Sequence, residues 1–223
     1  KKIKFIHIST DEVFGNIMKN SRADENFPYR PKNPYAATKA ASDHLINSYI
    51  NTFQLNVIIT NCCNNYGPKQ NPEKFIPKII SNIINHKKLP VYGRGLNSRE
   101  WIYVLDHCKA LYKVFRKGKA GETYNIGSNQ NYRNIDLVKK IVSISKSKKL
   151  YNNKSKIKFI KDRPGHDLRY AINSKKIRKE LNWKPEKNIN KGLLETIEWY
   201  KSNKRFYKSI KNKNFVTRLG RFR

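Results

Sequence analysis

Apolar segments of strand length alternate along this chain with amphipathic segments of helix length. This order constrains the fold more than any other feature, because strands joined through helices of ten or more residues pair in parallel. The alternation therefore predicts an α/β fold with a largely parallel sheet. We expect strands at residues 4–9, 55–60, 89–92, 99–104, 123–126 and 157–160. We expect helices at residues 34–53, 73–86, 106–117, 134–145, 174–181 and 191–202.

Side chains that cap helices mark two of the helix starts. Asn33 is a good N-cap residue, and Pro34 suits the first position of a helix because its missing N–H is not needed there. Asp106 follows the strand at residues 99–104. We expect Asp106 to cap the helix that runs to about residue 117.

Composition excludes several classes of protein. Hydrophobic residues make up 38% of the 223 residues and aromatic residues 12%, which is too rich for a disordered chain. No apolar run reaches the roughly 18 residues that span a bilayer, and no signal peptide is visible. The three cysteines (Cys62, Cys63 and Cys108) lack the spacing of a metal site. We interpret them as small core residues of a cytoplasmic protein, with no metal and no membrane partner.

The chain is strongly basic, with 48 Lys+Arg against 16 Asp+Glu and a formal net charge of +32. Such a charge suggests a nucleic-acid-binding module, with the highest local density at residues 146–161 and 201–223. No helix-turn-helix, zinc or RNP pattern accompanies it, and most of the basic residues are Lys. We therefore interpret the charge as a biased, solvated surface without a specific nucleic-acid partner, and keep the binding module as an alternative from another class.

Tyr35 and Lys39 lie four residues apart in the first predicted helix, so they share one helical face. An ammonium beside a phenol favours phenolate and lowers the tyrosine pKa from about 10 toward neutrality. Such a phenol can take a proton from a substrate hydroxyl while a hydride leaves the same carbon. Tyr-x-x-x-Lys alone is a weak signal, and two residues on a solvated helix face are the more common explanation of it.

A second cluster, residues 9–12 (Ser-Thr-Asp-Glu), stands where the first predicted strand ends. Open α/β sheets bind ligands at the carboxyl ends of their strands. Two adjacent carboxyl groups, Asp11 and Glu12, provide one acid and one base if their surroundings separate their pKa values. Without the Tyr/Lys pair, an acidic start of a loop or helix would explain this cluster equally well.

Together these stretches and several others resemble the extended short-chain dehydrogenase/reductases, and within them the NAD-dependent sugar-nucleotide epimerases and dehydratases. The resemblance is closest to the 4,6-dehydratases that act on dTDP-glucose, and it covers about residues 4–200. The matching stretches are residues 8–15 (ISTDEVFG), 33–45 (NPYAATKAASDHL), 60–77 (TNCCNNYGPKQNPEKFIP), 89–107 (LPVYGRGLNSREWIYVLDH), 121–128 (GETYNIGS), 162–172 (DRPGHDLRYAI) and 181–185 (LNWKP).

The resemblance implies roles for the catalytic residues. Tyr35 would deprotonate the sugar 4-hydroxyl while NAD⁺ accepts hydride from C4, and Lys39 would hold the cofactor ribose and tune Tyr35. Glu12 would remove the C5 proton, and Asp11 would protonate the C6 hydroxyl, which leaves as water. Thr10 would hydrogen-bond the sugar near O4. Hydride returning to C6 would give the 4-keto-6-deoxy sugar nucleotide.

Binding residues are implied in the same way. Asn64 would contact the substrate, and Asn65 and the Tyr35/Lys39 pair would contact NAD. The remaining implied contacts to the sugar nucleotide are Lys74, Phe75, Pro90, Val91, Tyr92, Arg99, Asn134, Arg163 and His166. A guanidinium fork suits a diphosphate, which is why Arg99 is a strong candidate.

The glycine-rich NAD fingerprint of this family (Gly-x-x-Gly-x-x-Gly) is absent from the 223 residues. We therefore expect the C-terminal part of an NAD-binding, Rossmann-type parallel sheet with a smaller α/β substrate-binding domain. Residues 1–72 would form the second half of the Rossmann-type domain, residues 73–203 mainly the sugar-nucleotide region, and residues 204–223 a basic tail. The chain would then be a fragment of a longer protein, or an inactive remnant, with little NAD⁺ affinity of its own.

Other enzymes of the same superfamily remain alternatives, namely a UDP- or GDP-sugar 4,6-dehydratase, a decarboxylase or a 4-epimerase. Epimerases need only the Tyr/Lys pair, so Asp11 and Glu12 argue against them. The resemblance also implies a homodimer. Leu45 and Ile46, together with the apolar face of residues 75–84, would supply its interface.

Overall fold

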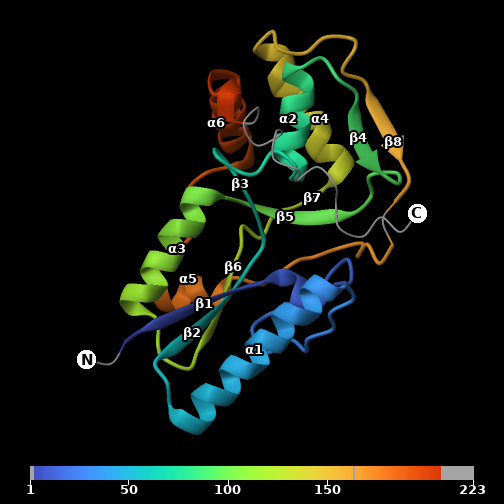
Figure 1. Ribbon diagram of the computed structural model, residues 1–223. Helices are drawn as coiled ribbons and strands as arrows, with labels where there is room; N and C mark the ends of the chain where they lie inside the picture. Colours follow the sequence, from blue (N-terminus) through green and yellow to red (C-terminus); the bar gives the residue numbers. More distant parts are fainter. Residues whose placement is uncertain (1–2, 163, 207–223) are drawn as a thin grey trace.

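The structure is a computed structural model that describes residues 3–162 and 164–206. Its helices and strands form two regions, which lie at the bottom and at the top of Figure 1. Within the described residues, no helix combines the length and apolarity needed to cross a lipid bilayer.

The lower region is built on a three-stranded parallel sheet in the order β1 (Phe5–Thr10), β2 (Val57–Cys62), β6 (Thr123–Ile126). All six residues of β2 are buried, as expected for the middle strand of a parallel sheet covered on both faces. In this register Ser9 pairs with Asn61 and Thr10 with Cys62, so β1 and β2 end at the same edge. The sheet therefore brings the segment that follows β1 next to the segment that follows β2.

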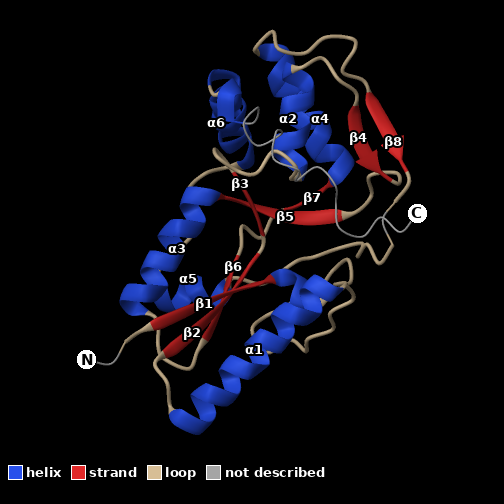
Figure 2. Ribbon diagram, in the orientation of Figure 1, coloured by secondary structure: helices blue, strands red, loops and turns tan. Residues whose placement is uncertain are grey.

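Helices cover both faces of this sheet. Figure 2 shows α1 (Pro34–Phe53) on one side of the strands, with α3 (Val104–Lys117) and α5 (Lys175–Leu181) on the other. The α1 start is the predicted one, because the Asn33 side chain accepts a hydrogen bond from the Ala36 N–H at 2.9 Å and Pro34 occupies the first turn. These elements place the start of α1 beside the carboxyl end of β1.

The upper region contains three helices, α2 (Phe75–Ile84), α4 (Asn134–Ser147) and α6 (Ile189–Ser202), which pack on one another. Beside them lies a two-stranded parallel sheet of β4 (Leu89–Tyr92) and β8 (Ile157–Ile160). Between the two regions, β5 (Ser98–Tyr103) pairs in parallel with β3 (Asn64–Tyr66) and antiparallel with β7 (Asn131–Arg133). Each region has its own hydrophobic core of buried side chains.

A long loop at residues 15–33 leads from β1 and η1 to α1, and Arg22 forms many of the hydrogen bonds that hold it. The Arg22 guanidinium donates to the fully buried Glu100 carboxylate at 2.6 Å, to the Ile172 carbonyl at 2.9 Å and to two acceptors on Asn129 and Asn131. Ala23 forms a β-bridge with Ile172. The loop and residues 169–173 are thereby fixed against each other close to the end of β1.

The predicted strands and helices are confirmed, with boundaries that coincide or differ by one or two residues. One cap was wrong: α3 begins at Val104 with Tyr103 at the N-cap, and Asp106 lies in the first turn, where its carboxylate accepts the Lys187 N–H at 2.9 Å. The three-residue strands β3 and β7 were not predicted, because such short segments carry no periodicity. The predicted division at residues 72 and 203 stays a prediction, and residues 207–223 of the predicted tail lie outside the described residues.

Candidate active site

The carboxyl end of β1 turns directly into a short 3₁₀ helix, η1 (Asp11–Phe14). Thr10 is its N-cap residue, with Oγ1 accepting the Glu12 N–H at 3.3 Å, and Gly15 ends it with a φ of +67°. A Cβ on Gly15 would lie 2.1 Å from the Arg30 carbonyl oxygen, so the chain can turn back here only as glycine. The turn sets Thr10, Asp11 and Glu12 side by side at the edge of the sheet.

Asp11 is buried and lacks a partner at one of its carboxylate oxygens. Oδ1 lies 3.3 Å from the Thr10 hydroxyl, whereas Oδ2 is buried without a hydrogen bond from the described residues. Burial, and then the neighbouring Glu12 charge, raise the pKa of Asp11 well above its usual range, and Arg99 only partly opposes them. The shift favours the neutral, proton-donating form of Asp11.

Glu12 has a different environment from its neighbour. Its Oε2 accepts a hydrogen bond from the Asn33 amide at 3.2 Å and lies 3.4 Å from the Tyr170 hydroxyl. Unlike Asp11, Glu12 is only partly buried, and the Asn33 amide donates directly to its carboxylate. The adjacent carboxyl groups thus differ in burial and partners, as a separate acid and base require.

Tyr35 and Lys39 extend from the first turns of α1 toward the same edge. Tyr35 is 55% exposed, and the Lys39 ammonium donates to the Ile8 carbonyl at 2.6 Å. Partial burial, and then Glu12, raise the pKa of Tyr35, although a hydrogen bond with Thr10 opposes them. The predicted lowering of the Tyr35 pKa was therefore wrong for this structure, because burial of the phenol, and then the charge of Glu12, act in the opposite direction.

Tyr170 and Asp167 also belong to this cluster, although the sequence analysis did not single them out. The Tyr170 hydroxyl donates to Asp167 Oδ2 at 2.7 Å. The Arg99 guanidinium stacks on the Tyr170 ring at 4.2 Å and donates to the Asp167 carbonyl at 2.8 Å. Both residues lie in the stretch at residues 162–172 that carries the family resemblance, and that stretch was the available signal.

Asn64 and Asn65 stand in β3, directly after β2. The Asn65 amide donates to Cys62 Sγ at 3.2 Å and to the Cys63 carbonyl at 3.3 Å. The Oδ1 atoms of Asn64 and Asn65 are buried and have no hydrogen-bond partner among the described residues. Buried polar atoms are normally paired, so these oxygens suit a ligand donor.

The residues implied for the nucleotide are spread over the upper region. Lys74 is exposed and lies 3.5 Å from Glu73, and Phe75 stacks on Trp101. Asn134 opens α4, where its N–H donates to the Asn97 carbonyl at 2.9 Å. Arg99 is buried and its NH groups contact backbone carbonyls, so its phosphate role stays a prediction.

In β4 the burial alternates along the strand. Val91 is fully buried in the upper core, whereas Pro90 and Tyr92 are half-buried. The Tyr92 ring meets the His166 ring edge-on at 6.3 Å, and His166 Nδ1 lies 2.7 Å from Asp162 Oδ1. Arg163 lies outside the described residues. The structure therefore brings Tyr92 and His166 together at the end of β4, with His166 next in sequence to Asp167 of the catalytic cluster.

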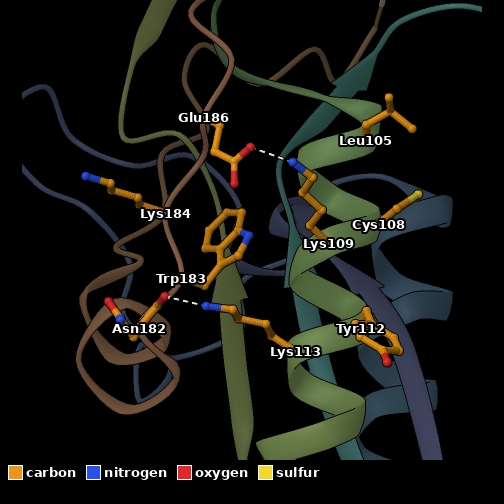
Figure 3. Close-up of a pocket in the computed structure, with 9 residues that line it drawn as sticks. All are labelled: Leu105, Cys108, Lys109, Tyr112, Lys113, Asn182, Trp183, Lys184 and Glu186. Carbon is orange, nitrogen blue, oxygen red and sulfur yellow. Dashed lines mark hydrogen bonds and ion pairs between the residues drawn. The ribbon is translucent and has the colours of Figure 1, made fainter.

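A groove of about 690 Å³ lies on another face, between α3 and residues 182–186 (Figure 3). Leu105, Tyr112 and Trp183 line it, and an ion pair of 2.5 Å joins Lys109 and Glu186 across it. Cys108 is exposed at this groove, so it is not the core residue that we expected, whereas Cys62 and Cys63 are buried. The residues predicted for catalysis are not among those that line the groove.

Comparison with known proteins places this geometry in context. A family profile described as GDP-mannose 4,6 dehydratase matches residues 1–196. A probable dTDP-glucose 4,6-dehydratase of Sinorhizobium fredii is 45% identical in an alignment of 222 positions that covers 97% of this chain and 63% of that protein. The chain thus spans less than two thirds of the length of this curated relative.

Solved structures of dTDP-glucose 4,6-dehydratases are similar to this chain in both fold and sequence. A dTDP-glucose 4,6-dehydratase from Bacillus anthracis in complex with NAD has a TM-score of 0.87 and 43% identity, covering 93% of this chain and 64% of that one. A dTDP-glucose 4,6-dehydratase from Streptomyces venezuelae, also with NAD bound, has a TM-score of 0.87 and 40% identity, covering 92% and 62%. These likenesses confirm the predicted α/β fold of Rossmann type.

Proposed function

The chain belongs to the GDP-mannose 4,6 dehydratase family, and from this premise we propose that it carries the acid, the base and the oxidation pair of a dTDP-glucose 4,6-dehydratase. The observation that carries the proposal is the contrast between Asp11 and Glu12. Asp11 is buried with a raised pKa, and Glu12 accepts hydrogen bonds beside it. Elimination of water needs such an acid and base, whereas epimerisation needs only Tyr35 and Lys39.

The residues present fit one side of an NAD cofactor. Tyr35 is half-exposed at the sheet edge where Rossmann-type folds bind dinucleotides, and the buried Asn65 Oδ1 lacks a partner among the described residues. Lys39 can exchange its bond to the Ile8 carbonyl for a ribose hydroxyl. NAD, when bound, supplies a hydride acceptor for the sugar C4 and afterwards a hydride donor for C6.

In the oxidation step Tyr35 Oη takes the proton of the sugar 4-hydroxyl, and the C4–O bond becomes a carbonyl. The phenol needs help to do this, because its pKa is raised in the absence of ligand. Release of Lys39 from the Ile8 carbonyl would place its ammonium closer to the Tyr35 oxygen, which favours phenolate. Thr10, already hydrogen-bonded with Tyr35, is placed to hold O4.

In the elimination step the new carbonyl acidifies the C5–H bond. The Glu12 carboxylate takes the C5 proton, and the C5 electron pair forms a double bond to C6. The C6–O bond breaks as Asp11 gives its proton to the leaving hydroxyl, which departs as water. After hydride returns to C6, the proton returns to C5 and the product is a 4-keto-6-deoxy sugar nucleotide.

The nucleotide is proposed to lie toward the upper region, against Asn64, Lys74, Phe75, Pro90, Tyr92, Arg99, Asn134, Arg163 and His166. We assign no direct contact to Val91, because it is fully buried in the upper core. UDP- and GDP-sugars remain the alternative substrates for the same chemistry.

We further propose a cytoplasmic homodimer formed through α1. Leu45, Tyr49 and Phe53 recur at every fourth residue and are 60%, 47% and 63% exposed, so they form an apolar stripe on the outer side of the helix. The α2 face that we expected to contribute is instead buried against its own core, through Ile76, Ile79, Ile80 and Ile83. The measured mass in solution of the complete gene product tests this.

The experiment that tests the activity uses the complete product of the gene. It is incubated with NAD⁺ and dTDP-glucose, UDP-glucose or GDP-mannose, and the products are followed by mass spectrometry. We expect dTDP-glucose to lose one molecule of water, and Tyr35→Phe to abolish the loss. If none of the three sugar nucleotides loses water, dehydration is refuted. If a UDP- or GDP-sugar is converted faster than dTDP-glucose, the assignment of thymine as the nucleobase of the substrate is refuted.

A further inference from the structure

A fully buried carboxylate, Asp43, lies between α1 and β1. Its Oδ1 lies 2.9 Å from His7 Nε2, and its Oδ2 accepts the Ser9 hydroxyl at 2.6 Å and the Tyr29 hydroxyl at 3.0 Å. An ionised carboxylate only accepts hydrogen bonds, so His7 donates from Nε2. Hydrogen bonds to a charged group are among the stronger ones in proteins. Asp43 thus ties one helix to two residues of one strand and to the loop that joins them.

Lys39 adds a fourth bond to the same junction. It lies one turn before Asp43, and its ammonium bonds the carbonyl of Ile8, between the two strand residues that Asp43 holds. Tyr35 lies one turn earlier again, so Tyr35, Lys39 and Asp43 follow one side of α1 at four-residue spacing. The same side of the helix therefore carries the predicted base, Tyr35, and the two residues that bond to β1, Lys39 and Asp43.

The junction is not itself a nucleophilic site. His7 and Ser9 both bond to the Asp43 carboxylate, whereas a catalytic triad needs the histidine between the serine and the acid. Ser9 and Asp43 are also buried, so substrate does not reach them. Their contribution to any reaction must come through the position of other groups.

We propose that Asp43 is a positioning residue that fixes the register of α1 against β1, and with it the place of Tyr35 relative to Thr10, Asp11 and Glu12. The inference rests on the proposed function. If Lys39 turns from the Ile8 carbonyl to a cofactor ribose, one of the four bonds is lost. Asp43 then keeps the helix in place during the reaction, when Tyr35 must remain within reach of the sugar hydroxyl.

The principal test is Asp43→Asn in the complete gene product. The amide has the size of the carboxylate, but it can no longer accept from all three donors. A small misplacement of a catalytic group costs up to about 100-fold in rate. We expect kcat for formation of the 4-keto-6-deoxy product to fall about 10- to 100-fold, with KM for the sugar nucleotide changed by less than about 3-fold.

A matched control separates position from stability. Asp106 is another buried carboxylate, on α3, and accepts one backbone N–H from Lys187. Asp106→Asn should lower the stability of the fold but leave kcat within about 2-fold. Equal kcat losses in Asp43→Asn and Asp106→Asn would overturn the proposal.

Milder variants keep the test decisive if Asp43→Asn does not fold. Ser9→Ala removes a hydrogen bond between Asp43 and β1. Tyr29→Phe removes the hydrogen bond between Asp43 and the loop, together with the hydrogen bond of Tyr29 with Asn61, but it leaves both bonds of Asp43 to β1. We expect Ser9→Ala to lower kcat more than Tyr29→Phe does. The reverse order would contradict a role in holding the helix to the strand.

A second readout needs no turnover. The ¹³C-tyrosine signal of Tyr35, assigned with Tyr35→Phe, reports its titration in nucleotide-free complete protein. Asp43→Asn should move the Tyr35 pKa toward its ordinary value, because the phenol would shift away from Glu12 and Asp11. An unchanged titration would overturn the proposal. If the wild-type protein dehydrates none of the sugar nucleotides, the proposed function fails, and this titration still decides the role of Asp43.

Discussion

The Tyr170 hydroxyl lies between two carboxyl groups, 2.7 Å from Asp167 Oδ2 and 3.4 Å from Glu12 Oε2. Burial, and then Glu12, raise the pKa of Tyr170, so the phenol keeps its proton. A phenol has one proton to donate, and the shorter distance assigns it to Asp167. The Glu12 oxygen that faces Tyr170 is thereby left able to accept a proton.

Asp11→Asn should stabilise the fold at neutral pH. The folded pKa of Asp11 is raised above its unfolded value of about 3.9, so its ionisation costs stability as pH rises above that value. We therefore expect the variant to be more stable than the wild type at pH 8, and the gain to shrink as the pH falls toward 4. Urea unfolding at pH 8 and near pH 4 checks this. A gain of the same size at both pH values would contradict the explanation.

Glu12→Gln should lower the pKa of Tyr35. Removal of a negative charge beside the phenol makes its ionised form less costly, and Glu12 is the largest charge contribution to the raised value. Titration of the ¹³C-tyrosine signal measures the change. Glu180→Gln is the matched control, because Glu180 accepts from the Tyr124 hydroxyl at 3.0 Å. It should shift Tyr124 and leave Tyr35 unchanged.

Arg22→Leu should destabilise the protein by about 3 kcal/mol or more. The substitution leaves the Glu100 carboxylate buried without its cation, and such breaks are costly. Denaturant unfolding gives the value. Arg133→Leu removes an exposed ion pair with Asp136 and should cost less than about 1 kcal/mol. If the two variants lost similar amounts of unfolding free energy, burial of Glu100 would not be the reason why the Arg22–Glu100 ion pair stabilises the fold.

Asn33 has two separable roles. Its Oδ1 caps α1, and its Nδ2 donates to Glu12. Asn33→Ala should cost about 1 kcal/mol of stability. Asn33→Ser should recover most of that stability, because serine also caps, but it should not restore the contact with Glu12. Water elimination by the complete gene product should therefore be slowed in both variants, and full activity of Asn33→Ser would contradict a role for this contact.

The 223-residue chain alone should bind NAD⁺ weakly. A Rossmann-type site holds the pyrophosphate on the backbone of a glycine-rich turn, and the motif Gly-x-x-Gly-x-x-Gly does not occur in these residues. Calorimetric titration of the chain, beside the complete gene product, measures the difference. Tight binding by the chain alone would show that Tyr35, Lys39 and Asn65 suffice.

The sequence predicted the fold well where one residue type decides local structure. Asn33 and Pro34 mark the start of α1, and the apolar segment of β2 marks a central strand. Asp106 shows the limit of such reasoning. Its carboxylate accepts a hydrogen bond from the backbone N–H of Lys187, 81 positions away in the sequence, and no local pattern predicts that partner.

The members of the candidate site were predictable from motifs, but their electrostatics were not. Spacing places Tyr35 and Lys39 on one face of α1, yet it does not show that Lys39 bonds the Ile8 carbonyl. Nor does it show that burial and the charge of Glu12 raise the pKa of Tyr35. Those facts depend on distances between β1 and α1, which only the folded chain defines.

The two hydrophobic cores have a consequence for how such a protein diversifies. Thr10, Asp11, Glu12 and Tyr35 stand on elements of the lower region, whereas Phe75, Tyr92 and Asn134 stand on elements of the upper region. Because each core is packed within its own region, side chains that face the nucleotide can be exchanged without repacking the elements that hold the acid and base. Descendants of one ancestral scaffold can therefore acquire new substrates while the same reaction is inherited.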